Sequence, residues 1–460
     1  MRNSSLTLNV TPRHNVVGLE STTVTTQVCA TLQARELPDD VQRASVDIMI
    51  ALDVSGSMSG DKLDLCKTTL EILLRQLTSE DSFGLVSFSG TAVLEIPAMR
   101  LTDSARKVAF SKIKSLQTRS STNLSAAIGL AAQELYAMPQ RNEVQSIFLL
   151  TDGEANNGIT SVDGLHELTK ICLASRKGTP TTMHCFGYGQ GHNDALLRML
   201  SSVTPGGTYN FVENDSAVAP AFGDALGGIL SVVAQNAVLN ITVPAAAREA
   251  GVKILAAYHE NTIQIDDWNY KVTIGDFYAE ESRDILFLVA LSKSALTIPH
   301  VQVSVSYSDT IEKALVVSPL QGCHIARPSS ADMSVSNDNV EVQWLRIYSV
   351  QQMERANELS SRGELKEARA EIAQAMEMIQ NCGKDLQANP IVMQLVGDLN
   401  DTRRGLVSST TYAAFGASRL SSRAQWHQYQ RSTFVEVGTA NVYRSTQKAT
   451  MARTFKNLTL

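Results

Sequence analysis

The sequence VDIMIALDVSGS, residues 46–57, joins an apolar run to a polar loop. The run is typical of a strand covered on both faces of a parallel sheet. Asp53, Ser55 and Ser57 follow directly, and a helix with apolar residues three and four apart begins near Leu63. Strand, polar loop and helix in this order predict a doubly wound, Rossmann-like α/β fold.

Two further polar loops follow downstream. Ser121-Thr122-Asn123-Leu124 begins a helix, and Thr151-Asp152-Gly153 ends a second apolar strand at 144–150. Ligands of doubly wound sheets bind beyond the carboxyl ends of the strands, so we expect Asp53 and Asp152 to lie close together. The three loops offer carboxylate and hydroxyl oxygens without thiolate or imidazole. Such ligands favour Mg²⁺ or Mn²⁺ over zinc or copper.

These motifs resemble the metal-ion-dependent adhesion site of von Willebrand factor type A domains. The resemblance implies two carboxylates that bind the metal directly or through water and three hydroxyl ligands: Asp53 and Asp152, and Ser55, Ser57 and Thr122. A partner's Asp or Glu carboxylate then fills the open coordination position. One difference is Ser120-Ser121, where the family often has two glycines. The alternative interpretation of the first loop is a simple turn and helix cap.

Both flanks of the α/β segment show strands of a different kind. Residues 6–10 alternate apolar and polar side chains, and the alternation returns at 239–243 and 301–307. A period of two is typical of strands with one buried face. We therefore predict one β-sandwich interrupted by the α/β segment, with linkers near 38–40 and 235–236 running side by side. Separate small β pieces are the alternative.

From Trp344 onward the pattern becomes helical. Two amphipathic helices separated by Ser360-Ser361-Arg362-Gly363 resemble a single tetratricopeptide hairpin, and a third helix is predicted over 391–406. A lone hairpin is not a stacked array, since about three repeats are needed to bury a core. We expect its apolar stripe to pack on the sandwich or to mediate self-association.

The tail from residue 407 is rich in Ser, Thr, Gln and Arg. Residues 418–460 contain several Arg and Lys residues but a single acidic residue, Glu436. Trp426 and Tyr443 make this composition unlike that of a disordered chain. The tail either docks on its own chain or on a partner, or it closes the helical module.

The last helix of the α/β segment, predicted over 217–233, contains Gly223, Gly227 and Gly228. Each glycine weakens a helix by roughly 1 kcal/mol relative to alanine. In related domains this helix moves when ligand binds at the metal, so one interpretation is a sliding switch. The other is that the glycines allow close packing of the helix on the sheet.

These observations divide the chain into five predicted segments. They are N-terminal sandwich strands at 1–45, a von Willebrand A domain at 46–235, the remaining sandwich at 236–340, a helical hairpin module at 341–406 and a basic tail at 407–460.

Composition limits the compartment and the partners. The 460 residues are 43% hydrophobic and 19% charged, with a net charge of −6, which argues against nucleic acid as the main partner. No apolar run is long enough to span a membrane, and the N-terminus lacks a signal-peptide core. The six cysteines form no Cys-x-x-Cys pair and are typical of free thiols in a reducing compartment. We expect a cytoplasmic protein.

Other chemistries find less support in the sequence. The run Cys185–Gly191 imitates a dinucleotide fingerprint, but its third glycine comes one residue early and it falls late in the sheet. Phosphate-loop and nucleophile-elbow motifs are absent from the sequence. His166, His184 and His192 do not neighbour the metal loops and are expected in the core, in caps or on the surface. A metal hydrolase needs a base, for which Glu154 is the obvious candidate.

The domain order resembles that of intracellular proteins such as plant-type RING ubiquitin ligases with a von Willebrand A domain. A RING needs a dense ladder of Cys and His, which this chain lacks, so ligase activity is not carried over. The predicted function is non-enzymatic, metal-dependent protein binding, with the chain as a possible subunit of a larger complex. The alternative is a structural or assembly subunit with a vestigial metal site, whose hairpin and tail make the contacts.

Overall fold

A computed structural model describes residues 4–22, 24–37, 41–152, 155–173, 181–189, 192–331, 335–433 and 441–459. The chain divides into two compact units. The α/β unit contains Leu37–Val232, Ser409–Ser422 and Ser432–Leu460, and the β/helix unit contains Met1–Glu36, Val233–Ser408 and Arg423–Arg431. Several sequence predictions fall outside the described residues: the linker at 38–40, Glu154 and the last two residues of the run 185–191.

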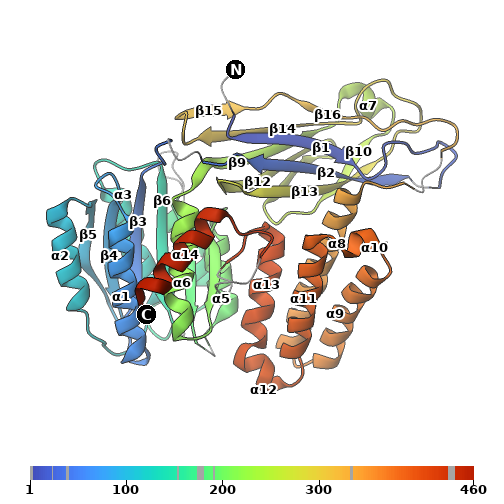
Figure 1. The fold of residues 1–460 in the computed structure, drawn as a ribbon. Coiled ribbons are helices and arrows are strands. Elements are labelled where there is room, and N and C mark those ends of the chain that lie inside the picture. Colours follow the sequence, from blue (N-terminus) through green and yellow to red (C-terminus); the bar gives the residue numbers. More distant parts are fainter. Residues whose placement is uncertain are drawn as a thin grey trace. The chain divides into compact units, whose positions relative to one another are not determined.

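The α/β unit is built on one six-stranded sheet with the order β5-β4-β3-β6-β7-β8 (Figure 1). Its strands are β3 (Val46–Asp53), β4 (Ser82–Phe88), β5 (Ala92–Arg100), β6 (Val144–Thr151), β7 (Thr181–Tyr188) and β8 (Thr208–Val212). All neighbouring strands pair in parallel except β5, which pairs antiparallel with β4. The predicted doubly wound α/β fold is confirmed. The antiparallel edge strand β5 was not predicted.

Five described α-helices lie between the strands along the chain: α1 (Asp61–Gln76), α2 (Asp103–Lys114), α3 (Leu124–Ala137), α4 (Val162–Leu173) and α5 (Asp194–Ser202). A further helix, α6 (Asp215–Ile229), follows β8. Polar side chains cap several of them, because the first N–H groups of a helix lack internal partners. The Asn123 side chain, for example, accepts from the Ala126 N–H at the start of α3. The apolar face of α3 packs with residues of β3, β4 and β6 in one buried cluster.

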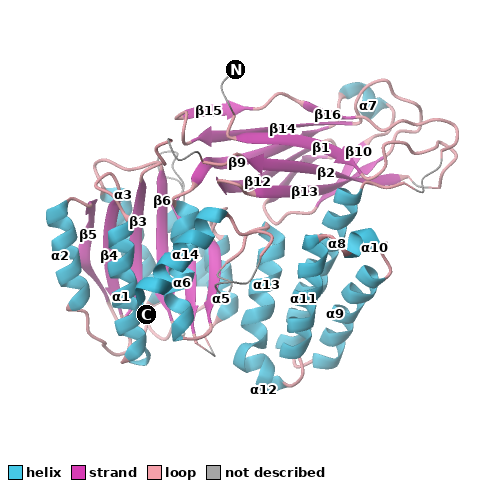
Figure 2. Ribbon diagram, in the orientation of Figure 1, coloured by secondary structure: helices cyan, strands magenta, loops and turns pink. Residues whose placement is uncertain are grey.

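Sheets of the β/helix unit combine strands from both sides of the α/β segment (Figure 2). One sheet has the order β1-β2-β13-β10, with β1 (Leu6–Pro12), β2 (Thr25–Ala34), β13 (Ser282–Ala290) and β10 (Lys253–Ala257). The other has the order β11-β12-β9-β14-β15, with β11 (Thr262–Asp266), β12 (Asn269–Tyr278), β9 (Val232–Thr242), β14 (Val301–Asp309) and β15 (Ala314–Val317); β16 (Gln321–Cys323) also pairs with β14. A short helix, α7 (Ala245–Glu249), follows β9. Because β2 pairs with β13, the α/β segment is inserted between strands of a single sheet.

The expected linker at 235–236 is instead part of a strand. Gln235 lies within β9 and pairs with Ser308 of β14. Strand β9 begins only three residues after the last residue of α6, Ile229. The start of β9 was missed because Val232, Val233 and Ala234 are all buried, so the alternation begins only beyond Asn236.

The helical region contains the predicted hairpin and third helix. Its helices are α8 (Asp338–Ser361), α9 (Leu365–Gln380), α10 (Lys384–Gln387) and α11 (Pro390–Gly405). The chain continues with α12 (Ser409–Thr411) and a π-helical turn at Tyr412–Gly416, which belong to the α/β unit, and with α13 (Ala417–Tyr429), which contains residues of both units. Gly363, at φ +84°, separates α8 from α9. Val340 and Ile347 of α8 share a buried cluster with Cys29 and Leu286 of the sandwich. The hairpin therefore packs on the sandwich, as expected.

The tail ends in a helix, α14 (Thr446–Thr459), that packs along α6 within the α/β unit (Figure 1). Lys448, Met451, Ala452 and Phe455 are its buried residues. This segment therefore docks on its own chain.

Candidate metal centre

The two predicted carboxylates lie at neighbouring strand ends. Asp53 is the last residue of β3, and Asp152 directly follows Thr151, the last residue of β6. Strands β3 and β6 are adjacent in the sheet, with Leu52 paired to Leu150. The chain runs outward from β3 to β4 and β5 and then returns to β6 on the other side of β3. The carboxylates therefore flank the switch point of the sheet, where ligands of such folds bind.

A continuous chain of hydrogen bonds joins four of the five predicted ligands. The backbone N–H of Ser55 donates to Asp53 Oδ1 at 2.8 Å, and the hydroxyls of Ser55 and Ser57 lie 3.0 Å apart. Ser57 Oγ donates to Asp152 Oδ1 at 2.7 Å. The second Asp53 oxygen, Oδ2, accepts from the Thr151 hydroxyl at 2.6 Å. The first and third loops thus meet through their side-chain oxygens.

The loop of Thr122 is fastened to its neighbours by its backbone. Arg119 N–H donates to Val54 O at 2.6 Å, and Asn123 N–H donates to Ser89 O at 2.7 Å. Thr122 is 3% exposed, and its N–H donates to Asn156 Oδ1 at 2.8 Å. Among the described residues, none forms a hydrogen bond with the Thr122 hydroxyl, so this oxygen is available as a ligand.

Ser121, in the same loop, has φ +60°. Glycine adopts this backbone region without cost, whereas a residue with a Cβ does so with strain. The glycine that the family often has here is therefore replaced by a serine in a left-handed conformation.

The two carboxylates have different electrostatic surroundings. Burial raises the pKa of Asp53; hydrogen bonds from Thr151 and Ser55 lower it, and the charge of Asp152 raises it. Asp152 instead forms an ion pair with Lys62, whose Nζ lies 2.5 Å from Oδ2. Lys62 was not among the predicted site residues. Its signal in the sequence was weak, because a lysine in the first turn of a helix is usually a solvated surface residue.

Comparison with known proteins identifies the α/β segment. A family model described as the von Willebrand factor type A domain matches residues 47–224. These residues are a von Willebrand factor type A domain. The domain contains β3 to β8 and most of α6, together with all five candidate ligands.

Relatives share the von Willebrand A domain in different settings. The chain is 26% identical over 264 residues to the E3 ubiquitin-protein ligase WAV3 of Arabidopsis thaliana, covering 57% of this chain and 33% of that protein. It is 27% identical over 283 residues to an uncharacterised protein of Synechocystis, covering 60% and 64%. The chain therefore matches from a third to just under two thirds of the length of these relatives.

Solved structures resemble almost the whole chain. A von Willebrand factor type A protein from Catenulispora acidiphila has a TM-score of 0.68 at 16% identity and covers 91% of this chain and 98% of its own. The ArnB paralog VWA2 from Sulfolobus acidocaldarius has a TM-score of 0.58 at 14% identity and covers 90% and 99%. At these identities the likeness concerns the fold. Within the described residues, no helix is long and apolar enough to cross a membrane.

The donor set of the von Willebrand A domain fits a hard divalent cation. Hydroxyl oxygens and two carboxylates are the ligand types that Mg²⁺ and Mn²⁺ accept. The Thr122 hydroxyl is available, and Ser55 and Ser57 place their hydroxyls side by side. Among the described residues, no three Asp, Glu, His or Cys side chains gather as a metal cluster, so this fit depends on the hydroxyls.

Other candidate residues in the domain have structural roles. His184 Nδ1 lies 2.8 Å from the Thr208 hydroxyl, and His192 Nε2 lies 2.5 Å from the Tyr209 hydroxyl; both histidines are buried, as expected. A Cβ at Gly187 would lie 2.4 Å from the His192 ring, so this glycine of the dinucleotide-like run makes room for a side chain. Burial lowers the pKa of His192, which favours the neutral ring.

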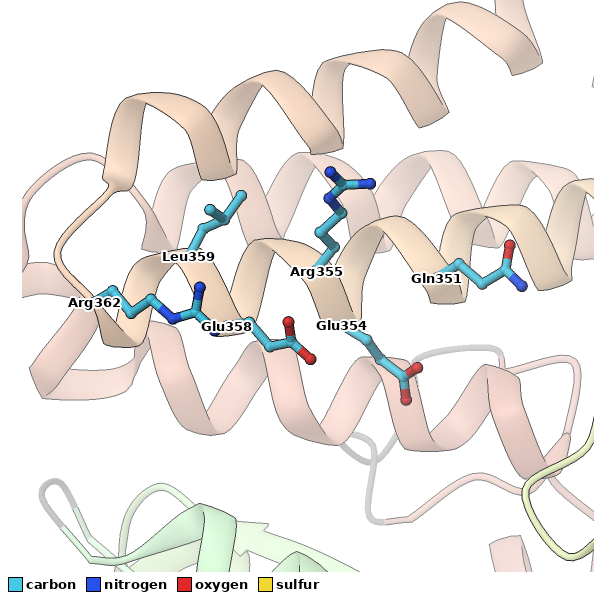
Figure 3. Close-up of a pocket in the computed structure, with 6 residues that line it drawn as sticks. All are labelled: Gln351, Glu354, Arg355, Glu358, Leu359 and Arg362. Carbon is cyan, nitrogen blue, oxygen red and sulfur yellow. The ribbon is translucent and has the colours of Figure 1, made fainter.

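Two pockets lie in the helical region of the β/helix unit. One, of about 490 Å³, is lined by Gln351, Glu354, Arg355, Glu358 and Leu359 of α8 and by Arg362, the residue that directly follows this helix (Figure 3). Its charged lining is typical of a solvated helix face and unlike the apolar pockets that bind small molecules. The other, of about 610 Å³, lies at α8, α9 and α10 and includes Trp344, Tyr348 and Met378.

Proposed function

We propose that this protein binds a partner protein through a divalent metal ion held by its von Willebrand A domain. The ion is Mg²⁺ or Mn²⁺, and an Asp or Glu of the partner completes its coordination. The observation that carries this proposal is the hydrogen-bonded series of residues from Asp53 through Ser55 and Ser57 to Asp152, at the switch point of the sheet. The domain family, whose members are typically protein-interaction modules, supports it.

The chemistry of the site favours binding by an acidic group. Only two of the five candidate ligands are negatively charged, and the other three are neutral hydroxyls. A divalent ion held by these ligands therefore retains an affinity for another anion. When bound, the metal supplies an electrophilic position for that carboxylate. The residues of this chain that would hold the ion are Asp53, buried at the end of β3, and Asp152, together with the hydroxyls of Ser55, Ser57 and Thr122.

A pull-down from native lysate tests the proposal. Wild-type and Asp53→Ala proteins are compared, each in Mg²⁺ and in EDTA, with Asp64→Ala as the control because Asp64 is an acid on the surface of α1 with 74% side-chain exposure. We expect partners that are captured only by the wild type and the Asp64 control, and only in Mg²⁺. An identical set of partners under every condition would contradict the proposal.

The alternative function is assembly through the hairpin and the tail. The buried face of the tail helix α14 is not available for such contacts. The tail helix α14 packs along α6 of its own unit and buries Met451, Ala452 and Phe455. Truncation after residue 340 would remove the hairpin, but it would also remove α14 and expose α6. A loss of binding in the truncated protein would therefore not distinguish assembly from metal-dependent binding. Substitutions confined to the exposed face of α8 test assembly without this defect.

We also propose a cytoplasmic location. Four cysteines are buried as free thiols, without a disulfide bond: Cys29, Cys66, Cys185 and Cys323. Free thiols are typical of reducing compartments. Fractionation of cells that express the tagged protein tests this expectation.

A further inference from the structure

Lys62 forms an ion pair with Asp152, one of the two candidate carboxylate ligands. Its Nζ lies 2.5 Å from Asp152 Oδ2 and 3.3 Å from the carbonyl oxygen of Ser57. The other carboxylate oxygen of Asp152 accepts from the Ser57 hydroxyl. Both oxygens of this ligand are therefore engaged, and one of them is engaged by a positive charge.

Burial explains why a positive charge is needed there. The Asp152 side chain is 2% exposed, whereas the Lys62 side chain is 35% exposed. A buried carboxylate without a counter-charge is costly, because it loses its hydration without a replacement. Lysine is a compact charge on a flexible stem, so it can cover Asp152 from the surface and also move away into solvent.

We propose that Lys62 is a tethered cation that neutralises Asp152 in the metal-free protein and leaves when the divalent ion binds. The inference rests on the proposed metal site. Two cations on one carboxylate repel each other, so the ammonium group and the metal compete for Asp152. Binding of the metal is thus an exchange of one cation for another, which lowers the apparent affinity for the metal and preserves the loops in its absence.

Asp53 offers a contrast within the same site. Its two oxygens accept hydrogen bonds from neutral donors, the Ser55 N–H and the Thr151 hydroxyl. These donors orient the carboxylate without competing for the charge of the metal. Competition is therefore expected at Asp152 and not at Asp53.

The test compares Lys62→Met with Lys67→Met in the full chain. Lys67 lies on the same helix, and its Nζ pairs with Asp64 at 3.2 Å, so this control removes the same charge beside a carboxylate that is exposed to solvent. Affinity for Mg²⁺ and Mn²⁺ is measured by titration calorimetry, and the unfolding temperature is measured in EDTA and in saturating Mg²⁺. These measurements need no partner.

Removal of Lys62 is expected to tighten metal binding by about tenfold or more, which corresponds to about 1.4 kcal/mol. In EDTA the Lys62→Met protein is expected to melt below the wild type, and in Mg²⁺ this difference is expected to close. The Lys67→Met protein is expected to match the wild type in both measurements. Lys62→Gln, which keeps a hydrogen-bond donor, is the second variant if Lys62→Met does not fold.

Each contrary result has its own meaning. Equal metal affinity in the wild type and the Lys62 variants would overturn the exchange but leave the metal site in place. A gain in affinity as large in Lys67→Met would also overturn it, because net charge would then explain the effect. Metal binding by none of these proteins would contradict the proposed function itself, and the exchange with it.

Discussion

Individual residues carry charge and strain whose effects can be measured one substitution at a time. Asp276 of β12 is 5% exposed, and Ser121 holds a left-handed backbone in the metal loop. Neither property can be recognised in the sequence, because burial and backbone torsion depend on the surrounding fold. Each leads to a specific expectation about stability.

Stability is expected to depend on pH through Asp276. Burial raises its pKa to about 6, although the charge of Arg431 and a hydrogen bond from Gln235 lower it. An acid with a raised pKa contributes stability that is fully present below its unfolded pKa and is lost as pH rises through about 6. The loss between pH 4 and 7 is on the order of 2–3 kcal/mol. Asp276→Asn should remove this dependence.

Tryptophan fluorescence in urea measures this effect selectively. Trp268, Trp344 and Trp426 are the three tryptophans of the chain, and all belong to the β/helix unit that contains Asp276. The difference in unfolding free energy between wild type and variant should change across this pH range. A constant difference would show that Asp276 is not the responsible group.

Replacing Ser121 by glycine is expected to stabilise the α/β unit by about 0.5–1 kcal/mol, since glycine adopts φ +60° without strain. The control is Ser120→Gly, at the preceding position of the same loop, where glycine only adds freedom to the unfolded chain. Urea unfolding followed by far-UV circular dichroism measures both. If both substitutions changed the stability in the same direction, the backbone of Ser121 would not be strained.

At the scale of elements, α14 packs closely against α6 at two glycines of α6. A Cβ at Gly223 would lie 2.7 Å from the Met451 carbonyl oxygen, and one at Gly227 would lie 2.9 Å from the Gln447 carbonyl oxygen. The glycines thus allow close approach of a second helix, where the sequence had indicated either the sheet or a sliding switch. Buried ion pairs of Asp224 reinforce this contact, with Arg444 Nε at 3.0 Å and Lys448 Nζ at 2.8 Å.

Gly227→Ala is therefore expected to destabilise the α/β unit by about 1–3 kcal/mol, because the backbone of α14 must shift. This loss outweighs the gain in helix propensity, roughly 1 kcal/mol. Gly129→Ala in α3 is the matched control, since nothing lies within 4 Å of its added Cβ, and it should stabilise. Thermal unfolding followed by circular dichroism compares the two variants. Stabilisation by both would show that α14 does not pack tightly on α6.

For the whole molecule, prediction succeeded where the signal is local. The apolar run at 46–52 and the three-to-four spacing of apolar residues in the helices can each be recognised within a short window. They were enough to predict the doubly wound sheet and the position of Asp53 and Asp152 at its edge. The tail was harder. In α14 the buried positions 448, 451, 452 and 455 follow a helical period, but the first is a lysine whose charge disguises the stripe.

The sequence by itself determined the candidate ligands, which are two carboxylates and three hydroxyls. It also determined that they lie in loops that a doubly wound sheet brings to one edge. Only the tertiary structure decided that Lys62 neutralises Asp152, and that Asp224 pairs with Arg444, 220 residues away. Local patterns depend on neighbouring residues and can be recognised in a short window. Ion pairs and close helix contacts join distant parts of the chain, so burial and position in the folded molecule determine them.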